Sequence, residues 1–189
     1  MKIGLYFGSF NPVHTGHCII ASHIINHTEL DQVWFIVSPH NPFKKSSTLL
    51  NEYHRLFMVQ LAIEGELFLR ASDVEFGLPK PSYTVDTLVY LHEKYAQHEF
   101  SMILGSDGFR NLHKWKNAKL IRSDYKLYVY IRPGFPVEKD PDLNMELLDA
   151  PLLLISSTHI REYVREKKSI RYLVPDKVKD EIEKNGYYR

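Results

Sequence analysis

Apolar positions along the chain fall into short runs with two different periods. Ile3, Leu5 and Phe7 alternate with smaller or more polar neighbours, which predicts a strand. The run at 31–38 has an unbroken apolar centre, which is typical of a strand buried on both faces of a parallel sheet. Further strands are expected at 67–69, 99–104, 125–131 and 152–155.

Between the strands, apolar residues recur at helical spacing, as Val85, Leu88 and Leu91 do. Helices are expected at about 13–27, 51–64, 85–95, 158–166 and from 174 onward, whereas 71–82 and the acidic stretch 135–150 are expected to be irregular. Strand and helix thus alternate, which predicts an α/β fold: a doubly wound, Rossmann-like parallel sheet with helices on both faces. No linker divides the chain, so we expect one domain over 1–189, with a small helical part at about 150–189.

Composition narrows the class of protein. The 24 Lys and Arg balance the 23 Asp and Glu, which argues against a nucleic-acid partner. No basic-then-apolar leader opens the chain and no apolar run approaches the length of a membrane span, so no membrane partner is expected. Cys18 is the one cysteine; it reads as a core residue, and the lack of a disulfide pair agrees with a cytoplasmic location.

The first strand leads into a loop and a helix that together suit an anion. Residues 8–12 break the apolar run, and the free N–H groups and positive dipole end of the following helix face the loop. His14 and His17 are three residues apart and would share one face of that helix. A zinc pair or two surface histidines are the alternatives, but no further Cys or His lies nearby to complete a metal site.

A second helix N-terminus carries similar chemistry. Ser157 or Thr158 would cap the helix at 158–166, which places hydroxyls, backbone N–H groups and Arg161 together. The small-residue turn at 105–107 ends a strand and would let a flat ring approach the backbone closely.

Other candidates have equally simple alternatives. Lys44 and Lys45 follow the second strand and suit a polyphosphate, although two solvated charges would give the same pattern. Trp115 lies among lysines and reads as a ligand contact or a partner surface. Tyr83 and Thr84 could simply begin a helix.

Several reaction classes are disfavoured because their signatures are missing. The chain has no G-x-x-x-x-G-K-[ST] loop, no G-x-G-x-x-G fingerprint and no Ser or Cys in a recognisable nucleophile setting. The two anion sites therefore favour direct in-line attack of one phosphate on another, which depends on positioning and charge stabilisation.

Two strings resemble the signatures of nucleotidylyltransferases. Residues 8–17, Gly-Ser-Phe-Asn-Pro-Val-His-Thr-Gly-His, are similar to G-x-F-x-P-x-H-x-G-H, and residues 155–161, Ile-Ser-Ser-Thr-His-Ile-Arg, to I-S-S-T-x-I-R. The second string separates them from the class I aminoacyl-tRNA synthetases, which share the first. Further pieces resemble the nicotinate- or nicotinamide-mononucleotide adenylyltransferases, and they lie in the family's order at 81–88, 105–107, 115, 132–134, 172–178 and 186–188.

This resemblance implies a role for each matching position. The residues implied at the ATP phosphates are Gly8, Ser9, Phe10, His14, Gly16, His17, Ser157, Thr158 and Arg161, with Lys45 as a further candidate. Among them, His14, His17 and Arg161 are the implied catalytic groups. Gly105 and Asp107 would hold the adenosine, and Tyr83, Thr84 and Trp115 would meet the pyridine ring. Mg²⁺ would enter bridging the phosphates of ATP, with no metal ligand from the protein.

The implied reaction joins ATP and nicotinate mononucleotide into deamido-NAD, with release of pyrophosphate. The alternatives are nicotinamide mononucleotide or phosphopantetheine as acceptor, or a non-catalytic nucleotide-binding module on the same fold. The sequence departs from the family at Asn11, where an acid is usual. It also has Pro-Phe-Lys-Lys where Pro-Pro-His-Lys is usual, so Lys44 has no assigned role.

Overall fold

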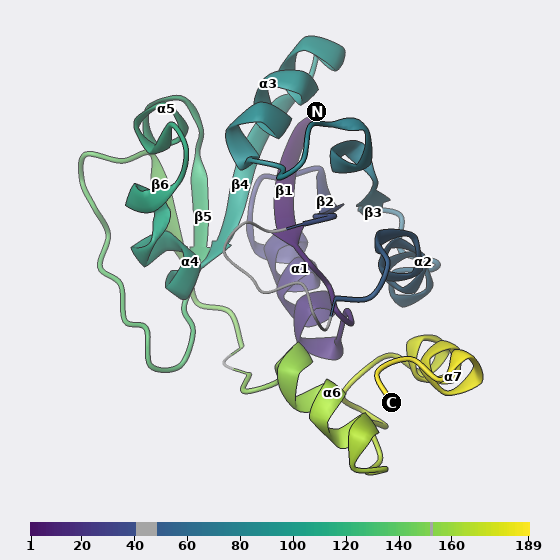
Figure 1. Ribbon diagram of the computed structural model, residues 1–189. Coiled ribbons are helices and arrows are strands. Elements are labelled where there is room, and N and C mark those ends of the chain that lie inside the picture. The colour runs from purple at the N-terminus through teal and green to yellow at the C-terminus, as the bar shows by residue number, and fades with distance from the viewer. Residues whose placement is uncertain (41–48, 152) are drawn as a thin grey trace.

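A computed structural model describes residues 1–40, 49–151 and 153–189, and within them six parallel strands form one sheet (Figure 1). The strands are β1 (Lys2–Gly8), β2 (Gln32–Val37), β3 (Leu69–Ser72), β4 (Glu99–Gly105), β5 (Leu127–Tyr130) and β6 (Met145–Leu148). The helices are α1 (Thr15–His27), α2 (Glu52–Ala62), α3 (Thr84–Lys94), α4 (Ser106–Arg110), α5 (Ala118–Asp124), α6 (Ser157–Arg165) and α7 (Asp176–Asn185), with short 3₁₀ turns η2 (Val74–Gly77) and η3 (Leu112–Lys114). The predicted doubly wound parallel sheet is confirmed.

The order of the strands creates a switch point in the middle of the sheet. Across the sheet the order is β3-β2-β1-β4-β5-β6, so the chain builds outward from β1 to β3 and then returns through α3 to place β4 beside β1. The connections after β1 and β4 therefore leave in opposite directions. In open α/β sheets, ligands bind in the crevice that opens at this point, outside the carboxyl ends of the strands.

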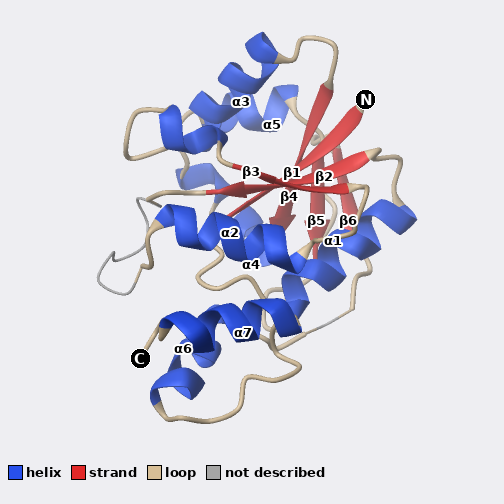
Figure 2. Ribbon diagram, turned by 90° about the vertical axis from the view of Figure 1, so that its right-hand side faces the viewer, coloured by secondary structure: helices blue, strands red, loops and turns tan. Residues whose placement is uncertain are grey.

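The apolar runs of the strands divide between two buried clusters, one on each face of the sheet. In β2, Val33 and Phe35 belong to the cluster beneath α1 and α2, whereas Trp34 and Ile36 belong to the cluster beneath α3 and α5. Figure 2 shows these two pairs of helices on opposite sides of the strands. Because both faces are covered, successive residues of β2 from Val33 to Val37 are all apolar and buried.

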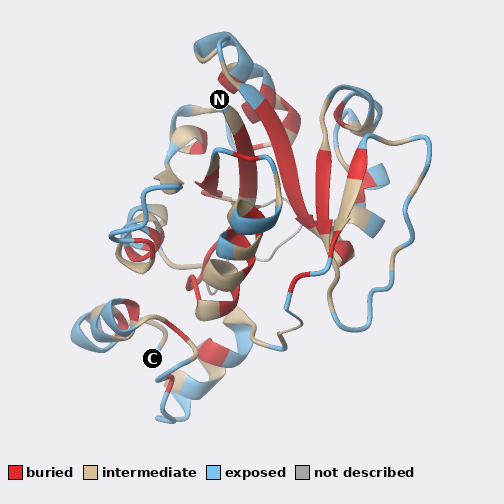
Figure 3. Cartoon of the chain, turned by 180° about the vertical axis from the view of Figure 1, so that it is seen from behind, coloured by how far each residue is buried: buried red, intermediate tan, exposed pale blue. Residues whose placement is uncertain are grey.

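The C-terminal helices pack into the first of these clusters. Ile160 of α6 and Val178 and Ile182 of α7 are buried there with residues of the sheet and of α1. The backbone N–H of Thr15 donates to the carbonyl of Leu173 at 3.0 Å, which ties the start of α1 to the segment between α6 and α7. In Figure 3 the buried residues follow the strands and the inner sides of these helices.

Two strand predictions at the sheet edges differ from the structure. The strand expected at 67–69 lies at 69–72, because Leu69 and Ala71 face the buried cluster while Leu67 is 84% exposed. The acidic stretch 135–150, expected to be irregular, contains β6, whose Met145 and Leu148 are buried.

The strand expected at 152–155 is wrong for its described part. Residues 153–155 have no regular structure, and Leu154 is 79% exposed; Leu152 lies outside the described residues. This segment connects β6 to α6 instead of adding to the sheet. The last strand of the sheet is β6, which pairs with β5.

Candidate active site

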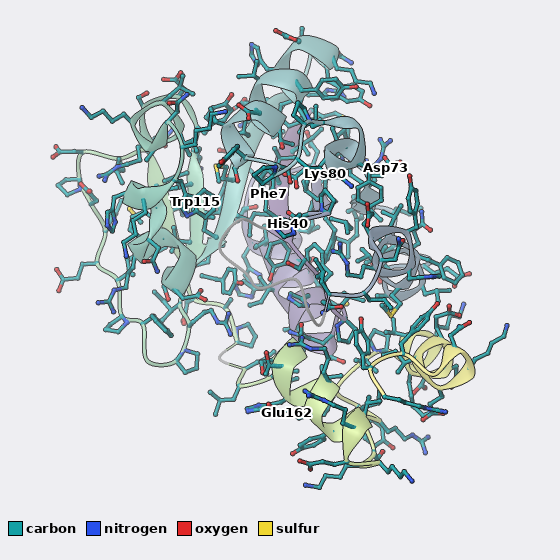
Figure 4. The ribbon with its side chains drawn as sticks, in the orientation of Figure 1. Phe7, His40, Asp73, Lys80, Trp115 and Glu162 are labelled. Atoms are coloured by element: carbon teal, nitrogen blue, oxygen red, sulfur yellow. The ribbon has the colours of Figure 1, made fainter. Side chains whose placement is uncertain are left out.

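A cleft of about 600 Å³ opens at the carboxyl edge of the sheet, at the switch point between β1 and β4. Its walls come from the segments that follow β1, β2, β4 and β5, from the start of α3, and from the start of α6. Trp115, from the β4–β5 half of the sheet, and Phe7, near the end of β1, come to this same edge (Figure 4). The fold thus brings segments far apart in sequence around one space.

The loop after β1 presents two stacked imidazole rings at the start of α1. His14 is the N-cap of α1, and its backbone N–H donates to Nδ1 of His17 at 3.2 Å. The ring centroids of His14 and His17 lie 3.6 Å apart at an interplanar angle of 23°. A Cβ at Gly16 would lie 3.1 Å from Nδ1 of His14, so glycine at this position lets the ring lie close to the helix.

The surroundings of these rings are largely apolar. The rings of Phe10 and Tyr6 approach His17 edge-on, with centroid distances of 5.0 and 6.0 Å. Burial, followed by the positive charge of Arg132, lowers the pKa of His14 to about 4. His14 is therefore neutral at pH 7 and can offer one N–H as a hydrogen-bond donor.

The start of α6 is joined directly to the loop after β1. Its N-cap is Ser156, whose Oγ accepts from the N–H of His159 at 3.2 Å, so the cap lies one residue before the positions expected from the sequence. The freed hydroxyl of Ser157 donates to the carbonyl of Pro12 at 2.9 Å. Arg161 donates to the carbonyl of Asn11 at 2.8 Å and to Oγ1 of Thr158 at 3.3 Å.

The turn after β4 is held by an ion pair to the end of β5. Nη1 of Arg132 lies 3.2 Å from a carboxylate oxygen of Asp107, and the Arg132 N–H donates to Oγ of Ser106 at 2.9 Å. A Cβ at Gly105 would lie 2.5 Å from Oδ1 of Asp107 and 2.9 Å from Cδ of Arg132. A side chain at residue 105 would require Asp107 and Arg132 to move, so glycine suits this arrangement of the turn.

The opposite wall of the cleft contains a buried carboxylate. Glu75 accepts hydrogen bonds at 2.9 Å from the hydroxyls of Ser82 and Thr87, which flank the N-terminus of α3. Burial raises the pKa of Glu75 above its ordinary value. The two bonds fix the segment that carries Tyr83 and Thr84 against the cleft.

Trp115 has contacts both in the core and at the cleft. It is half-buried and packs against the cluster beneath α3 and α5, while part of it still lines the cleft. Beside it, Lys116 lies over the ring of Tyr83 at 4.7 Å and pairs with Asp86 at 2.9 Å.

Most residues expected at the site line this one cleft. They are Gly8, Ser9, Phe10, His14, His17, Tyr83, Thr84, Gly105, Asp107, Trp115, Ser157, Thr158 and Arg161. Gly16 instead lines a smaller adjoining cavity of about 50 Å³, behind the histidines. Lys45 lies outside the described residues.

No sequence pattern assigned a role in the site to Arg132, Glu75 or Arg55. Arg132 stands out in the sequence only as part of the string 132–134, which resembles the family. Glu75 lies in the stretch 71–82, which has neither helical nor strand periodicity. Arg55 had a usable signal, because it occupies the first position of an i, i+3, i+4 stripe completed by Met58 and Val59, where a core residue is expected.

The described residues show neither a metal centre nor a membrane-spanning helix. No group of three or more His, Cys, Asp or Glu side chains in the described part of the chain could hold a metal ion. Within the same residues, no helix has the length and apolar character needed to cross a membrane.

The fold and the cleft define a nucleotide-binding α/β protein, since two helix N-termini meet at the switch point of a parallel sheet. The model of the cytidylyltransferase-like family matches residues 5–163. The chain belongs to this family. Full-length relatives at 49% and 52% identity place it among the family's nicotinate-nucleotide adenylyltransferases, which confirms the resemblance noted in the sequence.

The relatives match along the whole chain. A probable nicotinate-nucleotide adenylyltransferase of Flavobacterium johnsoniae is 49% identical, with all of both chains covered. Another, of Cytophaga hutchinsonii, is 52% identical over all of this chain and 98% of the relative. The solved structure of Plasmodium falciparum nicotinic acid mononucleotide adenylyltransferase complexed with NaAD has the same fold, with a TM-score of 0.85 and 22% identity over 99% of this chain and 97% of that one.

Proposed function

We propose that this chain transfers the adenylyl group of ATP to nicotinate mononucleotide, forming deamido-NAD and pyrophosphate. The observation that carries the proposal is the one cleft in which two helix N-termini, the glycine turn after β4 and the aromatic residues Tyr83 and Trp115 meet. The names of the relatives support the same reaction.

The reaction needs no covalent intermediate with the protein. An oxygen of the mononucleotide 5′-phosphate attacks the α-phosphorus of ATP, and the bond from that phosphorus to the oxygen bridging the β-phosphorus breaks. The bridging oxygen keeps the electron pair and leaves as part of pyrophosphate. Negative charge therefore grows on the β and γ phosphates, where His14, His17 and Arg161 supply donors and charge.

The two ends of the dinucleotide have separate positions in this proposal. The turn at Gly105 and Asp107 receives the adenosine. The start of α3 at Tyr83 and Thr84, with Trp115, receives the pyridine ring. Mg²⁺ enters with ATP as part of the substrate, bound by phosphate oxygens whose charge it partly neutralises.

Ser157 and Lys45 contribute to the part of the site that binds the ATP phosphates. The hydroxyl of Ser157 already holds the carbonyl of Pro12, so its first contribution is to the shape of the loop after β1. Thr158 and the N–H groups at the start of α6 then meet the β and γ phosphates. Lys45 adds a further positive charge.

The test is pyrophosphate release with Mg-ATP, run in parallel on nicotinate mononucleotide, nicotinamide mononucleotide and phosphopantetheine. We expect kcat/KM to favour the acid mononucleotide strongly. Comparable rates on acid and amide would mean a pocket that accepts both. Faster turnover on phosphopantetheine, or tight ATP binding without pyrophosphate release on any acceptor, would overturn the proposal.

A further inference from the structure

Arg55 is the largest fully buried side chain among the described residues, and it carries a charge. It lies on the inner face of α2, one turn before Met58 and Val59, and it does not line the cleft. Burying a guanidinium is unfavourable unless its donors are satisfied, so this position requires specific partners.

Those partners are backbone carbonyls from three separate segments. Nη1 donates to the carbonyls of Ser9, at 2.5 Å, and Ser38, at 2.8 Å. Nη2 donates to the carbonyl of Pro39 at 3.1 Å, and Nε to that of Leu50 at 2.7 Å. One side chain therefore joins the loops after β1 and β2 to the start of α2.

No carboxylate in the described residues lies within ion-pair distance of Arg55. Its neighbour Glu52 is paired with Lys80 at 2.8 Å. Residues 41–48 and 152 contain no Asp or Glu, so they add no acidic side chain. The charge of Arg55 is balanced by carbonyl dipoles, one of which belongs to the loop after β1.

The bond to Ser9 fixes the direction of a peptide at the cleft. In a trans peptide the C=O and the following N–H point in opposite directions. The Ser9 carbonyl points to Arg55, which does not line the cleft, so the N–H of Phe10 points away from Arg55, and Ser9 and Phe10 themselves line the cleft. Phe10 has a backbone φ of +45°, which is unfavourable for residues other than glycine. Its surroundings must therefore hold its backbone in this conformation.

We propose that Arg55 is a positioning residue, which holds the Ser9–Phe10 peptide in its strained orientation and thereby aims the Phe10 N–H at a phosphate of the bound nucleotide. This inference rests on the proposed function, because it takes ATP as the ligand of the loop after β1. Arg55 itself does not touch the substrate. It acts through the Ser9–Phe10 peptide, whose carbonyl it binds.

The test compares Arg55→Lys and Arg55→Met with the unchanged protein. Lysine keeps the charge without the planar fork, and methionine keeps most of the volume without the charge or the donors. We expect KM for ATP to rise by about tenfold or more in both variants, while KM for the mononucleotide stays nearly constant. The control is an Ile121 variant, to Val or Ala, chosen to give an equal fall in melting temperature, because Ile121 is buried on the opposite face of the sheet.

A second measurement follows the Phe10 amide directly by ¹H–¹⁵N NMR during titration with Mg-ATP. In the unchanged protein the Phe10 resonance should move as ATP binds, and in the Arg55 variants that response should be lost. The inference would be overturned by an unchanged KM for ATP, by an equal effect in the Ile121 control, or by a Phe10 amide that does not respond in the unchanged protein. The last of these needs no variant to fold.

The two proposals fail separately. If the unchanged protein releases no pyrophosphate with any acceptor, the proposed reaction is wrong. The ATP titration still decides the role of Arg55 in that case, because it measures nucleotide binding without turnover.

Discussion

His14 and His17 are stacked, but their surroundings give them different tasks. His14 is buried, its backbone starts α1, and burial with the charge of Arg132 keeps its ring neutral at pH 7. His17 lies one turn later on α1, with the rings of Phe10 and Tyr6 against it. We therefore expect His14 to hold the geometry of the loop and His17 to contribute more directly to charge stabilisation.

Replacing His17 with alanine should lower kcat by about a hundredfold or more, the usual effect of losing one donor that acts in the transition state. Steady-state pyrophosphate release measures it. The matched control is His92→Ala, because His92 is an exposed histidine on α3 that does not line the cleft. Near-normal turnover in His17→Ala would remove His17 from the catalytic set.

The depressed pKa of His14 should make stability depend on pH. The unfolded chain binds a proton at this histidine below about 6.5, whereas the folded protein does so only below about 4. The contribution of the neutral His14 ring to the free energy of unfolding is therefore fully present above pH 6.5. It falls as the pH drops from 6.5 towards 4. At about 1.4 kcal/mol for each pKa unit, the free energy of unfolding should fall by about 3 kcal/mol over this range.

NMR titration of the His14 ring and denaturant unfolding at several pH values test this expectation. The same series on His14→Gln should lack this part of the pH dependence. A His14 pKa near 6.5 in the folded protein would contradict it. Binding of Mg-ATP should raise the His14 pKa, because a nearby polyphosphate favours the protonated ring.

At the scale of elements, the cleft is formed by ends of helices and strands that are tied to one another. The start of α6 is joined to the loop after β1 through Ser157 and Arg161, and the start of α3 is joined to η2 through Glu75. These ties lie at the edge of the sheet, where the elements themselves do not contact each other along their lengths. They decide how precisely the walls of the cleft face each other.

Glu75→Ala should loosen the start of α3 and leave the hydroxyls of Ser82 and Thr87 without their acceptor. We expect KM for the mononucleotide to rise with little change in KM for ATP, and the free energy of unfolding to fall by about 1–3 kcal/mol. Glu75→Gln keeps the volume and should have a smaller effect. Steady-state kinetics with each substrate varied, and denaturant unfolding, measure both results.

The control for Glu75 is Glu93→Gln, an exposed acid on α3. Two outcomes would count against this account of the wall. One is an equal rise of both KM values, and the other is an effect of Glu93→Gln as large as that of Glu75→Ala.

At the scale of the whole molecule, the helical C-terminal part shares its core with the sheet. The cluster that buries Val178 and Ile182 also contains Tyr6 and Phe35 of the central strands. Removing α7 would expose the part of this cluster that Val178 and Ile182 cover, including residues of α2, which α7 contacts. The C-terminal helices therefore have no separate core.

We expect the chain to unfold in one cooperative transition, because these helices and the sheet lose the same buried contacts together. Calorimetry, with near- and far-ultraviolet circular dichroism as separate probes, checks this. Mg-ATP at about one hundred times its dissociation constant should add about 2.7 kcal/mol to the free energy of unfolding. Two transitions, with α7 lost first, would show that the C-terminal part is an independent unit.

The central elements were predictable because their information is local. The unbroken apolar run of β2, the apolar residues of β4, the helical spacing in α3 and the loop between β1 and α1 are properties of neighbouring residues. The structure has these elements where they were expected. The edges were harder. β6 has only four residues, Met-Glu-Leu-Leu, in an acidic stretch. The described part of the apolar run after it, 153–155, has no regular structure although its composition resembles a strand.

The sequence by itself determined the parallel sheet, its central elements, the family and thirteen of the residues that line the cleft, because each depends on a local pattern or a contiguous string. Only the tertiary structure decided how those residues are held. Arg55 binds the carbonyl of Ser9, and Arg161 binds that of Asn11, across 46 and 150 positions of the chain. Such bonds join a side chain to a backbone carbonyl, which every residue type carries, so no residue type at the accepting position marks them. They exist because the fold brings α2 and the start of α6 against the loop after β1.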